Sequence, residues 1–180
     1  MKILLHICCG VCAAGAADIL LAEGHGITGY YFNPNISSRE EHDKRLQASN
    51  TIAVVKNFPI IAPAYNPKQW TESTAELSKE PEGGKRCEVC FRIRLQSTYD
   101  YLKKNDFDAF TTTLTIGPMK SAEKINRIGK EIGGDKFLSR DFKKNGGAQL
   151  AIQLAKQYQI YRQNYCGCVY SLRINNNPKR

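Results

Sequence analysis

The segment of residues 2–32 limits the possible folds of this chain more than any other feature. A short apolar run is followed by a loop, an alanine- and leucine-rich stretch and a second apolar run, at Lys2 to Ile7, Ala13 to Glu23 and Ile27 to Phe32. This strand–loop–helix–strand order is typical of the unit from which parallel sheets are built. In such sheets, ligands bind beyond the carboxyl ends of the strands. We therefore expect an α/β fold with functional loops at that edge.

The remaining residues continue the alternation of strands and helices. Ser37-x-x-Glu40 is typical of a capping box that opens a helix. We expect further strands at Phe58–Ala62 and Asp106–Leu114, and helices from Ser37 to about Asn57, after Pro67, from Cys87, after Pro118 and at about Gln149–Tyr158. Since no linker or internal repeat interrupts the pattern, residues 1–180 are expected to form one domain with a Rossmann-like, parallel-sheet, three-layer fold.

Seven cysteines fall into three groups, with none left isolated: Cys8-Cys9-x-x-Cys12, Cys87-x-x-Cys90 and Cys166-x-Cys168. No apolar run is long enough to span a membrane, and Lys2 and His6 interrupt the first one, so we expect no signal peptide and a cytoplasmic location. In that reducing compartment, clustered cysteines are metal ligands or catalytic thiols rather than a disulfide framework.

Two of these groups predict a four-thiolate metal site. Cys8 and Cys9 follow the first strand, and Cys87 and Cys90 open a helix. Four thiolates suit zinc or an iron–sulfur cluster. We favour the cluster, because zinc pairs usually lie on glycine-containing knuckles and two adjacent cysteines fit poorly around one tetrahedral ion. The role of Cys12 stays open: a thiolate at a helix start, a spare ligand or a core residue.

Cys166-Gly167-Cys168 predicts a different chemistry. A disulfide across one intervening residue would be strained and easily reduced, which suits a redox step. Alternatively, one or both thiols bind a second metal, or both pack as small apolar groups. Asp141 is a candidate proton donor or oxygen ligand, and a surface ion pair is the alternative. Asn33, Asn35 and the threonines Thr111 to Thr113 could line the same crevice, whereas His6, His25 and His42 show no metal-ligand spacing.

The net charge of +9, from 26 basic and 17 acidic side chains, favours a polyanionic partner such as nucleic acid. Lys120, Lys124, Arg127 and Lys130 would lie on one side of the helix after Pro118. This stripe could hold a phosphate backbone, or it could be the solvated face of an amphipathic helix. A nucleotide-hydrolysing tRNA thiolase is disfavoured, because cysteines occupy the first loop in place of a glycine-rich phosphate loop.

Six motifs together resemble the QueH family of cobalamin-independent epoxyqueuosine reductases. They run in order from Lys2 to Ser171: Leu5-His6-x-Cys8-Cys9-x-x-Cys12, Phe32-Asn33-Pro34-Asn35-Ile36, Glu80-Pro81-Glu82-Gly83-Gly84-x-Arg86-Cys87-x-x-Cys90-Phe91, Phe110-Thr111-Thr112-Thr113-Leu114, Asp141-Phe142-Lys143-Lys144 and Tyr161-Arg162-Gln163-x-Tyr165-Cys166-Gly167-Cys168-x-Tyr170-Ser171. One departure is Gly10-Val11, where many members carry Ala-Pro; it loosens the loop but removes no ligand.

The resemblance implies a nucleotide alpha-hydrolase-like fold and a catalytic domain that reductively removes the epoxide oxygen of epoxyqueuosine at the wobble position of tRNA with a GUN anticodon. It implies a [4Fe-4S] cluster on Cys8, Cys9, Cys87 and Cys90. It also implies a redox role for Cys166 and Cys168, or a share in an adjacent mononuclear iron. The electron donor stays unidentified. The competing interpretation is a non-catalytic tRNA-binding module with a structural zinc site.

Overall fold

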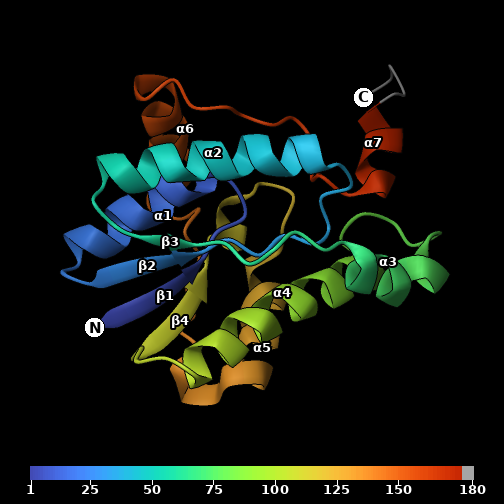
Figure 1. The fold of residues 1–180 in the computed structure, drawn as a ribbon, viewed down its shortest axis with the longest axis horizontal. Helices are drawn as coiled ribbons and strands as arrows, with labels where there is room; N and C mark the ends of the chain where they lie inside the picture. Colours follow the sequence, from blue (N-terminus) through green and yellow to red (C-terminus); the bar gives the residue numbers. More distant parts are fainter. Residues whose placement is uncertain (176–180) are drawn as a thin grey trace.

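The computed structural model describes residues 1–175 and contains a four-stranded parallel sheet (Figure 1). The strands are β1 (Lys2–His6), β2 (Gly26–Tyr30), β3 (Ile60–Ile61) and β4 (Ala109–Thr112), in the spatial order β3-β2-β1-β4. Both neighbours of β1 run parallel to it. Because the chain builds outward from β1 in one direction and later returns to its other side, the strand order reverses at β1. The predicted α/β class with a parallel sheet is confirmed.

Helices cover both faces of the sheet, which gives the three predicted layers (Figure 1). One face carries α1 (Gly10–Ala22), α2 (Arg39–Val55) and α6 (Gly147–Gln157), and the other carries α4 (Lys85–Lys103) and α5 (Ala122–Gly133). Two short helices, α3 (Lys68–Thr74) and α7 (Val169–Asn175), lie beyond the carboxyl ends of the strands. Short 3₁₀ turns are η1 (Ala75–Leu77), η2 (Thr113–Ile116) and η3 (Gly134–Lys136). No helix in the described part of the chain is long and apolar enough to cross a membrane.

The centre of the fold is β1, whose residues Ile3, Leu4 and Leu5 are fully buried. Such a continuous apolar run is what a parallel strand covered on both faces requires. The next element, α1, is buried on almost all sides, and its small residues allow close packing. A Cβ atom added at Gly10 would lie 2.7 Å from the backbone of Ala48 in α2, and one at Gly15 would lie 2.8 Å from the Cβ of Ala151 in α6. Two neighbouring helices therefore fix the start of α1, where the first cysteines lie.

Several element boundaries differ from the sequence-based expectation. The cap of α2 is Ser38, whose side chain accepts the N–H of Glu41, rather than Ser37. Ser37 is engaged elsewhere, because its own N–H donates to the carbonyl of Gly167. The strand expected at Asp106–Leu114 is shorter, since a 3₁₀ turn begins at Thr113. The sequence pattern did not predict helix α7.

Candidate metal centre and active site

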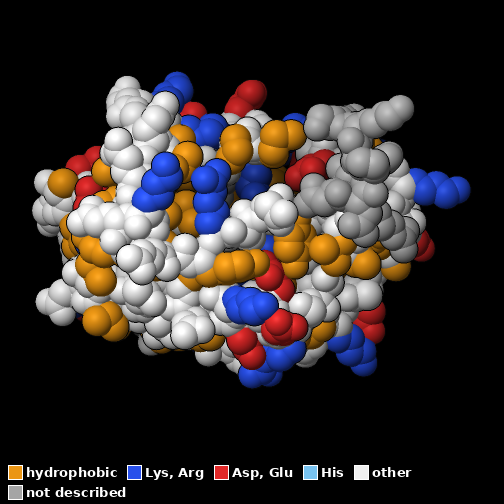
Figure 2. All heavy atoms as spheres, turned by 90° about the horizontal axis from the view of Figure 1, so that it is seen from above, with side chains coloured by type: hydrophobic (Ala, Val, Ile, Leu, Met, Phe, Trp, Pro, Cys, Tyr) orange, Lys and Arg blue, Asp and Glu red, His pale blue; other side chains and the backbone are white. Residues whose placement is uncertain are grey.

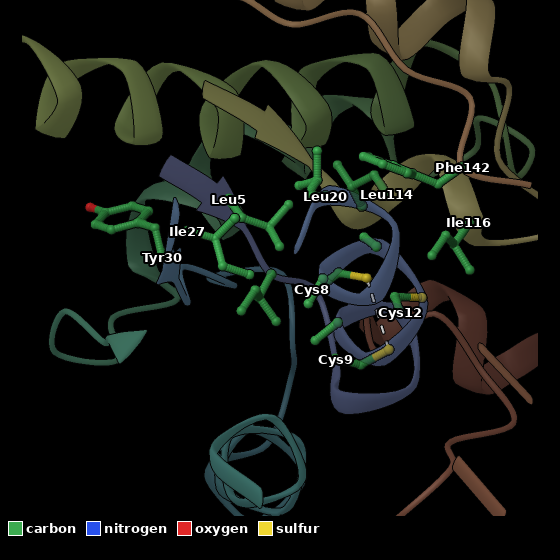
Figure 3. Close-up of a cluster of buried hydrophobic side chains, with 14 of the residues drawn as sticks. Leu5, Cys8, Cys9, Cys12, Leu20, Ile27, Tyr30, Leu114, Ile116 and Phe142 are labelled. Carbon is green, nitrogen blue, oxygen red and sulfur yellow. Dashed lines mark hydrogen bonds between the residues drawn. The ribbon is translucent and has the colours of Figure 1, made fainter. Parts of the chain in front are cut away.

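The first group of thiols lies where β1 ends and α1 begins, at the reversal of strand order. The sulfur atoms of Cys8, Cys9 and Cys12 all lie within 4.8 Å of one another. They point toward one another in Figure 3, and the sulfurs of Cys8 and Cys9 are 3.9 Å apart. Among the described residues, this is the one group of three or more metal-ligating side chains this close together. Soft thiolates in such an arrangement can bind a metal ion or cluster.

Thr113, the first residue of the 3₁₀ turn after β4, holds Cys8 in place. Its hydroxyl oxygen accepts the backbone N–H of Cys8 at 3.0 Å and donates to the Cys8 sulfur at 3.2 Å. His6 is structural, as expected: its Nε2 donates to the carbonyl of Phe32 and its Nδ1 accepts from the Thr112 hydroxyl. Burial lowers the pKa of His6 to about 3, so the ring is neutral. The ends of β1 and β4 are thus tied together around Cys8.

The second group of thiols comes from α4. Cys90 is buried and Cys87 is half-buried, and the N–H of Gly83 donates to the Cys87 sulfur at 3.2 Å. The loop that precedes them is folded by Arg86, whose guanidinium donates to the carbonyls of Leu77, Ser78 and Glu80. These hydrogen bonds fix the start of α4, so that both sulfurs lie near the carboxyl ends of the strands.

The third group is held by a buried arginine far away in the sequence. Arg45 of α2 donates to the carbonyls of Cys166 and Tyr165 at 2.9 and 3.2 Å, and it forms a buried ion pair with Glu41 at 2.7 Å. Gly167 has a φ of +110°, which other residues rarely adopt. These contacts fix the turn between Cys166 and Cys168. All seven cysteines are free thiols, so the structure corresponds to the reduced form of this pair.

Four cysteines share a cavity of about 110 Å³. Cys87, Cys90, Cys166 and Cys168 line it, together with Asn35, Trp70 and Lys120. The structure therefore brings the second and third groups to one space. Asn35 was expected at this crevice and is found in its wall, whereas Thr111 is bonded to the carbonyl of Leu138.

Lys120 links this cavity to the first group of thiols. Its pKa is raised, mainly by the negative charge of Cys166 and less by that of Cys8. The pKa of Cys166 lies well below its usual range, because Cys168 donates a hydrogen bond to it and Lys120 is nearby. The pKa of Cys8 is likewise lowered, by hydrogen bonds from Cys12 and Cys9. The charge of Lys120 thus favours the thiolates of Cys166, in the cavity, and of Cys8, in the first group.

Arg94 adds a second cation without a carboxylate partner. Its side chain is 2% exposed, one nitrogen donates to the Asn33 amide oxygen at 2.5 Å, and the Nε has no partner. Within residues 1–172, neither Arg94 nor Lys120 takes part in an ion pair with Asp or Glu. Since buried charge is costly unless it is compensated, these cations fit a site occupied by several thiolates or by an anionic group that the thiolates bind.

Asp141 lies outside this centre. It does not line the cavity, and its carboxylate accepts the Lys143 N–H at 3.2 Å and lies 3.8 Å from the Lys143 ammonium. Lys143 in turn donates to the carbonyl of Lys120. Asp141 is therefore connected to the cavity wall only through Lys143, which contacts Lys120.

The predicted basic stripe on α5 is largely neutralised by acidic neighbours. Lys124 and Arg127 lie 3.3 and 3.1 Å from Glu88, and Arg127 also pairs with Glu131. Lys120 belongs to the cavity instead of the exposed face. Lys and Arg side chains do gather near the middle of the face that carries α2 and α6 (Figure 2).

Sequence reasoning missed the roles of several residues in the site. Arg94 could have been found, because it lies four residues after Cys90 and seven after Cys87, on the same side of a helix. Arg45 and Trp70 could not, since their partners lie far away in the chain. No local pattern marks such contacts.

The comparisons with known proteins agree with the geometry. The sequence profile of a family described as "Epoxyqueuosine reductase QueH" matches residues 3–174. A relative named epoxyqueuosine reductase QueH in Haemophilus influenzae is 35% identical, over 97% of this chain and 73% of its own length. Those from Streptococcus pyogenes and Thermotoga maritima are each 34% identical; the alignments cover 96% and 94% of this chain and 71% and 90% of theirs.

A solved structure, the NMN synthetase from Francisella tularensis, superposes with a TM-score of 0.54 at 12% identity. The match covers 91% of this chain and 66% of that one, and it concerns the fold alone. The sequence match extends over all three cysteine groups and the elements that hold them. The chain belongs to the QueH family of epoxyqueuosine reductases.

Proposed function

We propose that this protein is an epoxyqueuosine reductase that acts on tRNA. The observation that carries the proposal is that the second and third cysteine groups line one cavity with Lys120, while the three thiols of the first group cluster at the reversal of strand order. Relatives that are 34 and 35% identical to this chain are named for the same activity. We further propose that the described chain acts as one catalytic domain in the cytoplasm.

The residues present fit an iron–sulfur cluster. We propose Cys8, Cys9, Cys87 and Cys90 as the ligands of a [4Fe-4S] cluster, with Cys12 as the competing thiol because it lies beside Cys8 and Cys9. A thiolate-bound cluster carries negative charge, which Arg94 and Lys120 would offset without any acidic partner of their own. A cluster bound there would supply electrons one at a time.

Cys166 and Cys168 match the stoichiometry of the reaction. Conversion of an epoxide to an alkene consumes two electrons and two protons and releases water. Two thiols that close to a disulfide release two electrons and two protons, so this pair alone balances the reaction. A separate electron donor must then reduce the disulfide before the next turnover. The alternative is that these thiols hold an adjacent mononuclear iron.

The protein supplies position and charge around the reacting group. Arg45 fixes the turn that carries Cys166, Thr113 fixes Cys8, and the charge of Lys120 lowers the pKa of both thiols. Asp141 stays our candidate for a proton donor to the leaving oxygen, although its carboxylate is engaged with Lys143. The Lys and Arg side chains gathered on the face that carries α2 and α6 suit the phosphates of a tRNA (Figure 2). The bases of an anticodon loop are already single-stranded, so the modified base is accessible.

Turnover by the loaded protein tests the proposal. The anaerobically reconstituted protein is incubated with tRNA that carries epoxyqueuosine, with excess dithionite. We expect the nucleoside recovered after digestion to have lost one oxygen atom. The matched control is the same protein without reconstitution. If the loaded protein leaves the epoxide intact while it binds the tRNA, the activity assignment is wrong.

A further inference from the structure

Trp70 is the one tryptophan of the chain, and it lies against the thiols. It belongs to α3, is 4% exposed and forms a small buried cluster with Cys90 and Cys168. The ring of Tyr170 packs beside it, with the two ring centroids 6.1 Å apart. Trp70 also lines the cavity that contains the second and third cysteine groups. Its position is therefore fixed by contacts on several sides.

The indole N–H of Trp70 is a buried donor without an acceptor. Within residues 1–172, no atom accepts a hydrogen bond from its Nε1 at full hydrogen-bonding geometry, although the N–H lies close enough to the Cys90 sulfur to act against the burial that raises the pKa of that thiol. Buried tryptophan N–H groups usually find a partner, because a buried donor without an acceptor destabilises the folded state. The amide oxygen of Asn35, which lines the same cavity and also lacks a partner, does not accept it. The Trp70 N–H therefore has room for a stronger acceptor than the protein offers it in the absence of a metal.

The sulfur of Cys90 is the candidate acceptor, because Cys90 packs with Trp70 in the same buried cluster and lines the same cavity. A neutral thiol is a weak acceptor, whereas a thiolate is a strong one. We propose that the Trp70 indole N–H donates to the Cys90 sulfur once that sulfur is a metal-bound thiolate, and that this hydrogen bond raises the reduction potential of the bound cluster. The inference rests on the proposed function, in which Cys90 is a ligand.

The expected direction follows from charge. Reduction adds one electron and one negative charge to the cluster, so a donor at a ligating sulfur stabilises the reduced state more than the oxidised state. Hydrogen bonds to the sulfurs are among the factors that set iron–sulfur potentials. Without this donor, the one-electron reduction should become harder. Trp70 is therefore a positioning and tuning residue rather than one that touches the substrate.

A redox titration of the Trp70→Phe variant tests this role. Phenylalanine keeps an aromatic ring but has no N–H. We expect full iron and sulfide content, and a tenfold smaller equilibrium constant for reduction, which is a potential about 59 mV more negative. Tyr170→Phe is the matched control: it removes a hydroxyl from the neighbouring ring and should leave the potential unchanged.

A second substitution is used if the Trp70→Phe protein does not bind the cluster. Since Trp70 is the one tryptophan, expression with 3-benzothienylalanine replaces only this indole by a ring of the same shape without the N–H. The same negative shift is expected. A loaded variant whose reduction constant stays within twofold of the wild type would overturn the role of Trp70. A wild-type protein without iron and sulfide would instead overturn the ligand assignment on which it rests.

Discussion

The hydroxyl of Thr113 links the 3₁₀ turn after β4 to the loop after β1. It accepts the N–H of Cys8 and donates to the Cys8 sulfur, and it is fully buried. Removing it leaves the Cys8 N–H without a partner in a place that water does not reach. The position of the Cys8 thiol, a proposed ligand, therefore depends on a residue 105 positions away in the chain.

Thr113→Val should destabilise the metal-free protein by about 1–3 kcal/mol, because the buried N–H of Cys8 loses its acceptor. The free energy of unfolding is measured in urea. Thr113→Ser, which keeps the hydroxyl and loses one methyl, should cost about 1 kcal/mol or less. If the valine variant were as stable as the serine variant, the hydroxyl would have no structural role.

Cys166→Ser tests the thiol pair. If Cys166 and Cys168 supply electrons and protons, the serine variant should keep its iron and sulfide but lose turnover by at least a hundredfold, even with excess dithionite. Full turnover of this variant would exclude the thiol-pair chemistry. Loss of iron relative to the wild type would instead show that Cys166 is a metal ligand.

At the scale of the elements, the placement of α1 decides where the first thiols lie. Its small residues allow it to approach α2 and α6 so closely that a single added methyl group has no room. Close packing of this kind resists changes of even one methylene.

Gly15→Ala should therefore lower the free energy of unfolding by about 1–3 kcal/mol, although alanine favours a helix by about 1 kcal/mol over glycine. The added Cβ would lie 2.8 Å from the Cβ of Ala151. Combining it with Ala151→Gly should recover part of the loss, which a double-mutant cycle measures. Strictly additive losses would show that the two helices do not meet as described.

The first strands and helix were predictable because the pattern of apolar residues along the sequence marks where each of them begins and ends. Residues 2–32 alone predict β1, α1 and β2, since a fully buried strand and an alanine-rich helix leave clear local signatures. The cap of α2 shifted by one residue because Gly167, distant in sequence, engages Ser37. The end of β4 shifted because Thr113 turns toward Cys8. Tertiary contacts, not local propensity, set these ends.

The site was predictable only where the chain itself groups the residues. The spacing of the cysteines marks three local clusters, and parallel strands bring such clusters to one edge. Arg45 contacts Cys166 across 121 residues, and no pattern in the sequence indicates that pairing. Lys120 was expected on an exposed stripe, and its position in the cavity follows from the turn before α5 rather than from helical periodicity.

At the scale of the whole molecule, the excess of positive charge would attract a tRNA over a long range. The net charge is +9, but Glu88 and Glu131 pair with the charges of α5. Binding should therefore depend on other basic residues near the cysteine edge. Arg162 is exposed and lies in the segment that leads to Cys166.

Arg162→Ala should weaken tRNA binding and reduce the slope of log K against log salt concentration by about one, as loss of one phosphate contact does. Lys136→Ala is the matched control, since Lys136 is also exposed but follows α5 at the opposite edge of the sheet. The slope is obtained from binding titrations at several salt concentrations. Equal slopes for both variants would place the tRNA on a different surface.

Analysis of iron, sulfide and zinc in the anaerobically purified and reconstituted protein tests the central claim most directly, namely that the first two cysteine groups bind an iron–sulfur cluster beside the Cys166–Cys168 pair. We predict about four irons and four sulfides per chain with a visible iron–sulfur absorption band, and iron beyond that number if an adjacent mononuclear site is filled. One zinc and no sulfide after reconstitution would contradict the account and indicate a structural thiolate site instead.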